Sequence, residues 1–204
     1  LTTNGRRILA WEQVGGSIRL RLFDAWSEQD DLWKLETPLG CKGQIVGGNE
    51  FALLETSGKF TVLSLASGQP VVSSQLQPET ELHSLVVWPS KEQYTVLANR
   101  QIPTSLPSTT QPISGGSMGG QHAHGYVYAI DRQTGKNRWS VPAFISQHGI
   151  PYDQPADSPL LVCLCNRQGA TQNQWISTLL CLDKRTGAIA YQGDIATAQA
   201  NMCE

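Results

Sequence analysis

The stretch that decides the fold reads Ala129-Ile130-Asp131-Arg132-Gln133-Thr134-Gly135-Lys136-Asn137-Arg138-Trp139 and follows the apolar run Tyr126-Val127-Tyr128. Alternation predicts a strand in which Tyr126, Tyr128 and Ile130 point to one face and Val127 and Ala129 to the other. Asp131 ends the strand, where its carboxylate can accept backbone N–H bonds from the next residues. Gly135 is expected at a positive φ, which such a turn needs. The chain then returns antiparallel and presents Trp139.

A weaker copy occurs later in the chain as Cys181-Leu182-Asp183-Lys184-Arg185-Thr186-Gly187-Ala188-Ile189-Ala190-Tyr191. Both copies resemble the tryptophan-docking motif of the pyrroloquinoline-quinone-like β-propeller repeat, Ala-x-Asp-x-x-Thr-Gly-Lys-x-x-Trp. The first copy matches it at every fixed position. The second keeps Asp183, Thr186 and Gly187, with Gly187 also expected at positive φ, and has Tyr191 for the Trp. The resemblance implies that Trp139 is buried between blades, that the small Ala129 leaves room for an indole, and that Tyr191 still fills an aromatic pocket.

Two fainter copies set the period of the repeat. The strand-ending positions are Asp24, Ser64, Asp131 and Asp183, which lie 40, 67 and 52 residues apart. A four-stranded propeller blade takes roughly 40 to 50 residues, so the sequence predicts blades at about 1–38, 39–77, 78–144 and 145–195. The copy at Asp24 has Ser27-Glu28 in place of Thr-Gly and ends in Trp33, one residue out of step. The copy at Ser64 has Val72 where the Trp belongs, so tryptophan docking at that blade boundary is in doubt.

The rest of the chain reads as short strands separated by turn residues, with no clean helical period. A return strand is expected at Asn137–Val141, and the Pro-rich residues 150–159 are expected to connect two blades or to line the mouth of the propeller. The predicted fold class is therefore all-β, with about four blades of four antiparallel strands. The family repeat usually builds seven or eight blades. We therefore expect the chain to be part of a larger propeller, as an open arc or as a portion of a ring completed by another chain or by further blades. A small closed ring of four blades is the alternative.

Composition excludes several classes of function. The chain of 204 residues is 40% hydrophobic and 16% charged, with a formal net charge of −2. That favours a packed globular core over disorder. No basic block suggests nucleic-acid binding, and no apolar run is long enough to span a membrane. The first residues do not resemble a signal peptide and include no initiating Met, so a piece of a longer protein is expected.

Two segments are candidates for a site. Residues 101–121 form an uncharged insertion rich in Pro, Gly and Ser, expected to be a mobile loop, or else a lid or partner-binding loop. His122 and His124 follow it. Two imidazoles at i and i+2 of a strand project to one side and could share a metal, given a third ligand such as Asp153 or Asp157. His122 and His124 are the best metal candidates in the sequence, but spacing fixes no third ligand for them.

Five cysteines lie at positions 41, 163, 165, 181 and 203. Cys163 and Cys165 should share one face of a strand, but C-x-C is not the common zinc spacing. Buried free thiols are the expected state. A bridge from Cys163 or Cys165 to Cys181 stays open as an alternative.

The sequence carries no recognisable catalytic signature. Quinone dehydrogenases with this repeat carry an adjacent Cys-Cys pair and a Ca²⁺ site, and neither can be mapped here. The resemblance therefore favours the non-catalytic scaffolds built from the same repeat, such as the outer-membrane assembly-factor propellers. We predict a scaffold that binds a protein or peptide partner, extracytoplasmic by resemblance, with no cofactor. The alternative is a part of a quinone- or metal-dependent oxidoreductase whose catalytic residues lie outside this chain.

Overall fold

The computed structural model describes residues 2–27, 31–102, 110–112, 120–168 and 175–195. All regular secondary structure in these ranges is β-strand, and they contain no helix that could cross a membrane. The chain divides into two compact units. Unit 1 comprises residues 1–100 and 130–137, and unit 2 comprises residues 101–129 and 138–204.

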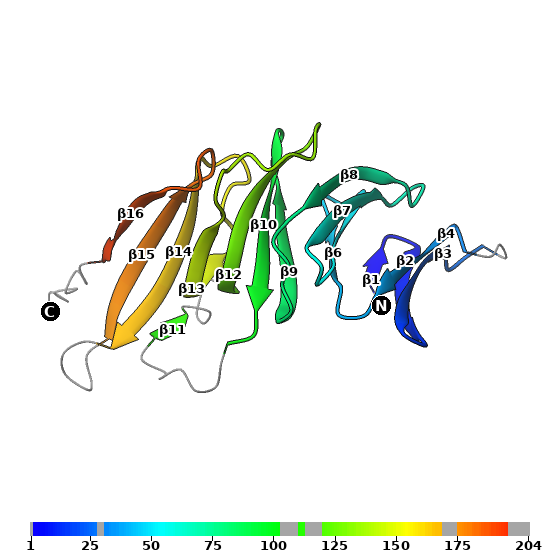
Figure 1. The fold of residues 1–204 in the computed structure, drawn as a ribbon, viewed down its shortest axis with the longest axis horizontal. Helices are drawn as coiled ribbons and strands as arrows, with labels where there is room; N and C mark the ends of the chain where they lie inside the picture. The colour runs from blue at the N-terminus through cyan, green and yellow to red at the C-terminus, as the bar shows by residue number, and fades with distance from the viewer. Residues whose placement is uncertain (1, 28–30, 103–109, 113–119, 169–174, 196–204) are drawn as a thin grey trace, which may run out of the picture. The chain divides into compact units, whose positions relative to one another are not determined.

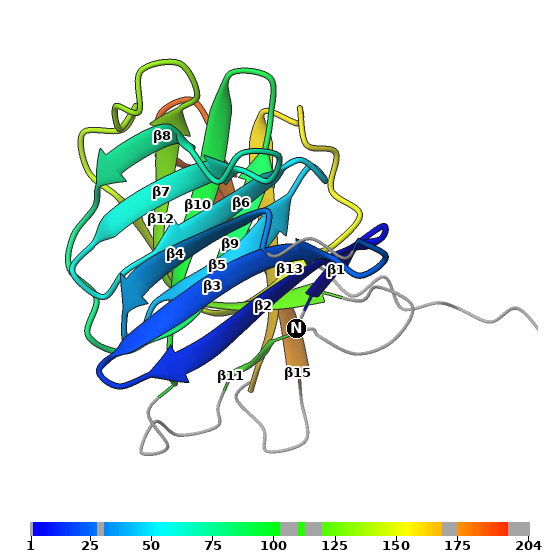
Figure 2. The ribbon, with the colours of Figure 1, turned by 90° about the vertical axis from the view of Figure 1, so that its right-hand side faces the viewer.

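Unit 1 contains two antiparallel four-stranded sheets, each built from consecutive strands (Figures 1 and 2). The first sheet consists of β1 (Thr2–Asn4), β2 (Arg7–Val14), β3 (Ser17–Asp24) and β4 (Trp33–Pro38). The second consists of β5 (Lys42–Val46), β6 (Glu50–Leu54), β7 (Lys59–Ser64) and β8 (Pro70–Gln75). Phe51, Phe60 and Val62 are almost fully buried, so the second sheet is covered on both faces. Burial on both faces is what a blade packed between neighbours requires.

The hairpin of β9 (Leu82–Pro89) and β10 (Gln93–Arg100) completes the strands of residues 1–100 in unit 1. The side chain of Gln44 links β5 to this hairpin, since its amide accepts from the Val87 N–H at 2.8 Å and donates to the Val87 carbonyl at 3.3 Å. Tyr94 is fully buried and donates to Glu50 at 2.9 Å, while Arg132 pairs with the other Glu50 oxygen at 2.7 Å. This network ties the turn after Asp131 to the second sheet.

Unit 2 is built from a run of antiparallel strands in the order β16-β15-β14-β13-β12, with β11 beside β14 (Figure 1). The strands are β11 (Thr110–Pro112), β12 (Gly120–Asp131, whose last two residues belong to unit 1), β13 (Ala143–Pro151), β14 (Leu160–Gln168), β15 (Trp175–Asp183) and β16 (Ile189–Asp194). Strands β13 to β16 are consecutive, like the four strands of each sheet in unit 1. The predicted fold class, all-β with about four blades of four antiparallel strands, is confirmed.

Several finer expectations need correction or stay open. Residues 137–141 do not form a strand, because only a single bridge joins Asn137 to Ile130 and Pro142 has no N–H to extend a ladder. The strand β13 was missed by the sequence reading. The proposed blade boundaries stay a prediction. Most of the insertion at 101–121 lies outside the described residues.

Candidate functional site

Three turns repeat one backbone arrangement, and we call them the glycine turns: residues 64–69, 131–136 and 183–188. In each, the strand-ending residue donates its N–H to the carbonyl five residues later, at 2.9 Å in all three. The glycine four residues later donates back to the strand-ending carbonyl at 2.8 to 2.9 Å. The glycines Gly68, Gly135 and Gly187 have φ of +68°, +70° and +76°. The positive φ expected at Gly135 and Gly187 is therefore confirmed.

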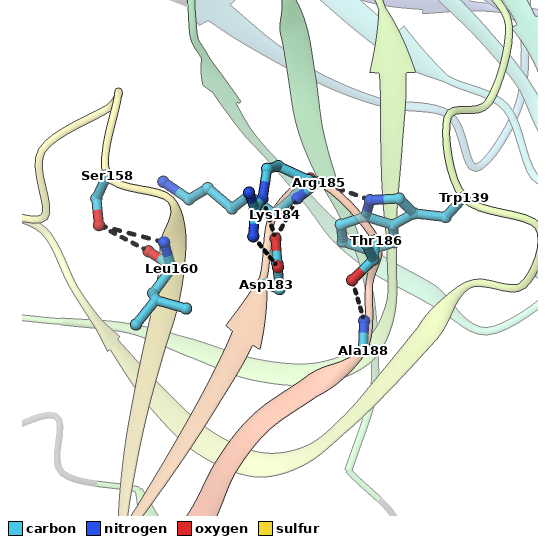
Figure 3. Close-up of polar contacts among 8 residues, drawn as sticks. All are labelled: Trp139, Ser158, Leu160, Asp183, Lys184, Arg185, Thr186 and Ala188. Carbon is cyan, nitrogen blue, oxygen red and sulfur yellow. Dashed lines mark hydrogen bonds and ion pairs between the residues drawn. The ribbon is translucent and has the colours of Figure 1, made fainter.

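The aspartates at the start of two glycine turns act as caps, in different ways. Asp131 accepts from the backbone N–H of Gln133 at 3.1 Å and of Thr134 at 2.9 Å, as the sequence predicts. Asp183 accepts from the backbone N–H of Arg185 and also binds its guanidinium, both at 2.8 Å (Figure 3). The hydrogen bond from the Arg185 side chain lowers the pKa of Asp183 to about 2.

Two tryptophans lie on glycine turns in the same way. The Trp139 indole N–H donates to the Lys184 carbonyl at 3.0 Å, as Figure 3 shows, and Trp33 donates to the Leu65 carbonyl at 3.0 Å. A Cβ on Gly187 would lie 2.7 Å from the Trp139 ring, and one on Gly68 would lie 2.6 Å from the Trp33 ring. Trp139 is 3% exposed. Each glycine is thus needed twice, for its φ and for the ring that covers it.

The other two expected positions differ from this arrangement. At the turn 131–136 a Cβ on Gly135 would lie 2.3 Å from the Ser73 carbonyl and 3.5 Å from Val72, so the backbone of β8 lies where an indole would. Tyr191, expected to fill an aromatic pocket, is 49% exposed. Ala129 and Ile130 are fully buried, and Tyr128 is almost fully buried.

A pocket of about 390 Å³ opens in unit 1, lined by Trp11, Ile18, Cys41, Lys42, Gly43, His83, Ser84 and Leu85. The residues come from β2, β3, β5 and β9, with Cys41 just before β5. None of the eight is acidic, and Lys42 and His83 supply the groups that can carry positive charge. The volume lies in the range of pockets that bind small ligands or single anchoring side chains.

Trp11 is the prominent side chain of this pocket. Its ring packs on Phe51 with centroids 6.1 Å apart, yet it remains 44% exposed. Phe51 in turn lies against Gly43, where a Cβ would come within 2.3 Å of the ring. The absence of a side chain at Gly43 therefore lets Phe51 support Trp11 from below. Sequence patterns missed the pocket, because no local spacing connects Trp11, Lys42 and His83.

The predicted metal candidates occupy strand β12. The pairing of β12 with β13 shifts between Ala123 and Gly125, so His124 lies in an irregularity of the ladder. Its ring packs edge-on against Phe144 at 5.6 Å. No group of three or more His, Cys, Asp or Glu side chains that could hold a metal occurs in the described ranges, so neither Asp153 nor Asp157 joins His122 and His124 there. Metal binding at this pair stays a prediction.

No family model matches the chain, and no curated protein matches it. Among solved structures it is similar to a europium-containing methanol dehydrogenase, with 13% identity and a TM-score of 0.44 over 91% of this chain and 39% of that chain. It is also similar to BamB from Moraxella catarrhalis, with 11% identity and a TM-score of 0.35 over 94% of this chain and 78% of that chain. A eukaryotic initiation factor matches with 12% identity and a TM-score of 0.41 over 93% of this chain and 42% of that chain. Likenesses at this level assign no activity and no partner to this chain.

Proposed function

We propose that this chain is a non-catalytic binding module for a protein or peptide partner, and that the pocket in unit 1 receives the partner. The observation that carries the proposal is Trp11, a large aromatic side chain left 44% exposed at a pocket of about 390 Å³. Aromatic side chains of this kind dominate binding energy at protein interfaces. The cation-forming groups of Lys42 and His83 favour a partner segment that places an apolar anchor beside an Asp or Glu.

The repeat supports a finer proposal about assembly. Trp33 and Trp139 each lie on the glycine turn of the following copy, whereas Tyr191 is half-exposed at the equivalent position of the last copy. We infer that the chain uses the quinone-like repeat and that Tyr191 packs on a further glycine turn, supplied by additional blades or by another chain. The same resemblance motivates an extracytoplasmic location.

A selection of random peptides displayed on phage against the whole chain provides ligands for a direct test. We expect selected peptides to carry an aromatic or aliphatic residue next to a carboxylate. Trp11→Ala should weaken their binding by about 10- to 100-fold, the usual loss at a buried aromatic anchor. Lys42→Glu should also weaken peptide binding, and by a larger factor at low salt than at high salt, because salt screens the interaction between charges. The matched control is Trp26→Ala, because Trp26 is 85% exposed in the same unit and does not line the pocket.

Equal affinity of wild type and Trp11→Ala for every selected peptide would remove the pocket from the proposal. The oxidoreductase alternative has its own test, which is redox-dye turnover after addition of pyrroloquinoline quinone and Ca²⁺ to the full-length protein. Turnover that depends on both additions would replace the scaffold proposal.

A further inference from the structure

One thiol of unit 2 lies in surroundings unlike those of the other described cysteines. Cys41, Cys163, Cys165 and Cys181 are all free and buried. The open possibility of a bridge to Cys181 is not realised, and the register explains why. Cys181 pairs with Val162 and Cys163 pairs with Leu180, so Cys181 lies on the opposite face of the sheet from Cys163 and Cys165. Cys165 shares its face of the sheet with Cys163, and it differs from Cys163 in having polar side chains beside it.

Those neighbours come from the two adjacent strands. Cys165 pairs directly with Thr178 on β15, and its Sγ lies 2.8 Å from the Thr178 Oγ1. On the other side, the pairing of Gly149 with Leu164 brings His148 of β13 opposite Cys165, on the same face of the sheet. Arg167 on the same strand adds positive charge, although Asp194 pairs with it at 2.7 Å. His148 and Arg167 favour a negative charge on the sulfur, whereas the Thr178 hydroxyl donates to the Cys165 carbonyl at 3.2 Å and can accept from the thiol.

A bulge in the sheet orients His148. Ala123 pairs with His148 and Gly125 with Ile145, so Ser146 and Gln147 together oppose the one residue His124. Gln147 has a φ of +54°, the only positive φ of a non-glycine residue in the described part of the chain. The His148 Nδ1 donates to the Ser146 carbonyl at 2.7 Å, and a carbonyl can only accept. Nε2 is thereby left as the nitrogen available to the Cys165 thiol.

We propose that Cys165 and His148 form a nucleophilic thiol site that reacts with small hydroperoxides. The arrangement is a nucleophile, a base beside it, and a third group that fixes the base in one tautomer. Cys165 is 3% exposed, so the proposal requires a reagent as small as hydrogen peroxide. This inference does not depend on the peptide-binding proposal, because no residue of the unit 1 pocket takes part.

The reaction balances with the peroxide as the only oxidant. The Cys165 thiolate attacks one peroxide oxygen, so that an S–O bond forms and the O–O bond breaks. The leaving hydroxide takes the proton of the His148 imidazolium and departs as water. Cys165 is oxidised by two electrons to the sulfenic acid, the peroxide is reduced, and His148 ends neutral.

Electrostatics agree with the geometry. Burial alone would raise the pKa of Cys165, but hydrogen bonding with His148 and Thr178 lowers it below the usual range of a thiol. Burial would lower the pKa of His148, and its hydrogen bond with Cys165 raises it instead. Burial raises the pKa of the Cys41, Cys163 and Cys181 thiols. Cys165 is the exception among the four.

The test is residue-resolved alkylation of the full chain with iodoacetamide between pH 5 and 9, followed by peptide mass spectrometry. A Cys203→Ser background removes the one thiol outside the described residues. We expect the alkylation midpoint of Cys165 to lie below the pH of about 8.5 for a free thiol and below the midpoint of Cys41, a comparison that does not depend on how accessible each thiol is. Hydrogen peroxide with dimedone should label Cys165 first.

Two variants separate chemistry from structure. His148→Asn keeps a donor for the Ser146 carbonyl and removes the base, so the alkylation midpoint of Cys165 should move up and the rate at pH 7 should fall about tenfold. Trp26→Ala, at an 85% exposed side chain of unit 1, should leave the profile unchanged. If His148→Asn loses its native circular dichroism, Thr178→Val tests the same site through the other partner. A Cys165 midpoint no lower than that of Cys41, or a pH profile that neither His148→Asn nor Thr178→Val moves, would overturn the proposal.

Discussion

Replacing Trp139 by Ala tests the packing of an indole on a glycine turn. The side chain is 3% exposed and its N–H donates to the Lys184 carbonyl at 3.0 Å. Truncating a buried Trp costs about 3–5 kcal/mol, part of which here is the carbonyl left without its donor. Trp139→Phe keeps most of the ring and loses the hydrogen bond, so its cost should be about 1–2 kcal/mol.

The assay is urea unfolding of the full chain followed by far-ultraviolet circular dichroism. With a slope of about 2 kcal/mol per molar urea, Trp139→Ala should move the midpoint down by about 2 M. Because the chain divides into two compact units, the unfolding curve is fitted with two transitions. Trp26→Ala is the control, since Trp26 is 85% exposed and its loss should change stability by less than about 0.5 kcal/mol. A Trp139→Ala variant as stable as Trp26→Ala would refute the reasoning.

Three further predictions concern the turns and the buried network. Gly187→Ala should destabilise by about 2 kcal/mol or more, because φ is +76° and the new Cβ would meet the Trp139 ring, whereas Gly16→Ala, with nothing within 4 Å, should be nearly neutral in the same urea assay. The carboxylate of Asp183 has a pKa of about 2 against 3.8 for the free group, so the stability that the ionised carboxylate adds is present above pH 3.8 and is lost as the pH falls toward 2. Asp183→Asn should therefore make the urea midpoint depend less on pH between pH 2 and 5, and a variant whose midpoint depends on pH as that of the wild type does would contradict this. Burial, with the Glu50 hydrogen bond, raises the pKa of Tyr94 to about 12, so the stability that the neutral phenol adds is present below pH 10 and is lost as the pH rises through 12. Between pH 9 and 12 the Tyr94→Phe variant should therefore lose less stability than the wild type. Urea midpoints that fall in parallel with pH for both proteins would contradict this.

The turns were readable from the sequence and the sites were not, for a physical reason. Asp131 and Gly135 act through local backbone geometry, so five consecutive residues specify their roles, including the positive φ. Strand β13 was missed because it is interrupted by a bulge, a glycine and a terminal Pro151, which break the alternation of a strand. Because β13 was not predicted, the sequence could not place His148 beside Cys165. The pocket depends on residues from four strands, whose proximity is a tertiary property that no local pattern encodes.

The role of Gln44 is a second feature that the sequence could not predict. Its side-chain amide pairs with both backbone groups of Val87, and Gln154 does the same for Val162 at 2.7 Å. Each glutamine supplies the hydrogen bonds that a neighbouring strand would otherwise make. A glutamine beside a strand carries no sequence signal for this role, because the partner is distant in the chain or fixed by a loop.

The most direct test of the binding proposal is a nitrogen–proton correlation spectrum of the six indole N–H groups, assigned by single substitutions and recorded while a phage-selected peptide is added to the whole chain. The proposal predicts that the Trp11 signal shifts in proportion to bound peptide, while the Trp26 signal stays in place. Saturable peptide binding that moves Trp26 or other indoles and leaves Trp11 unshifted would contradict it.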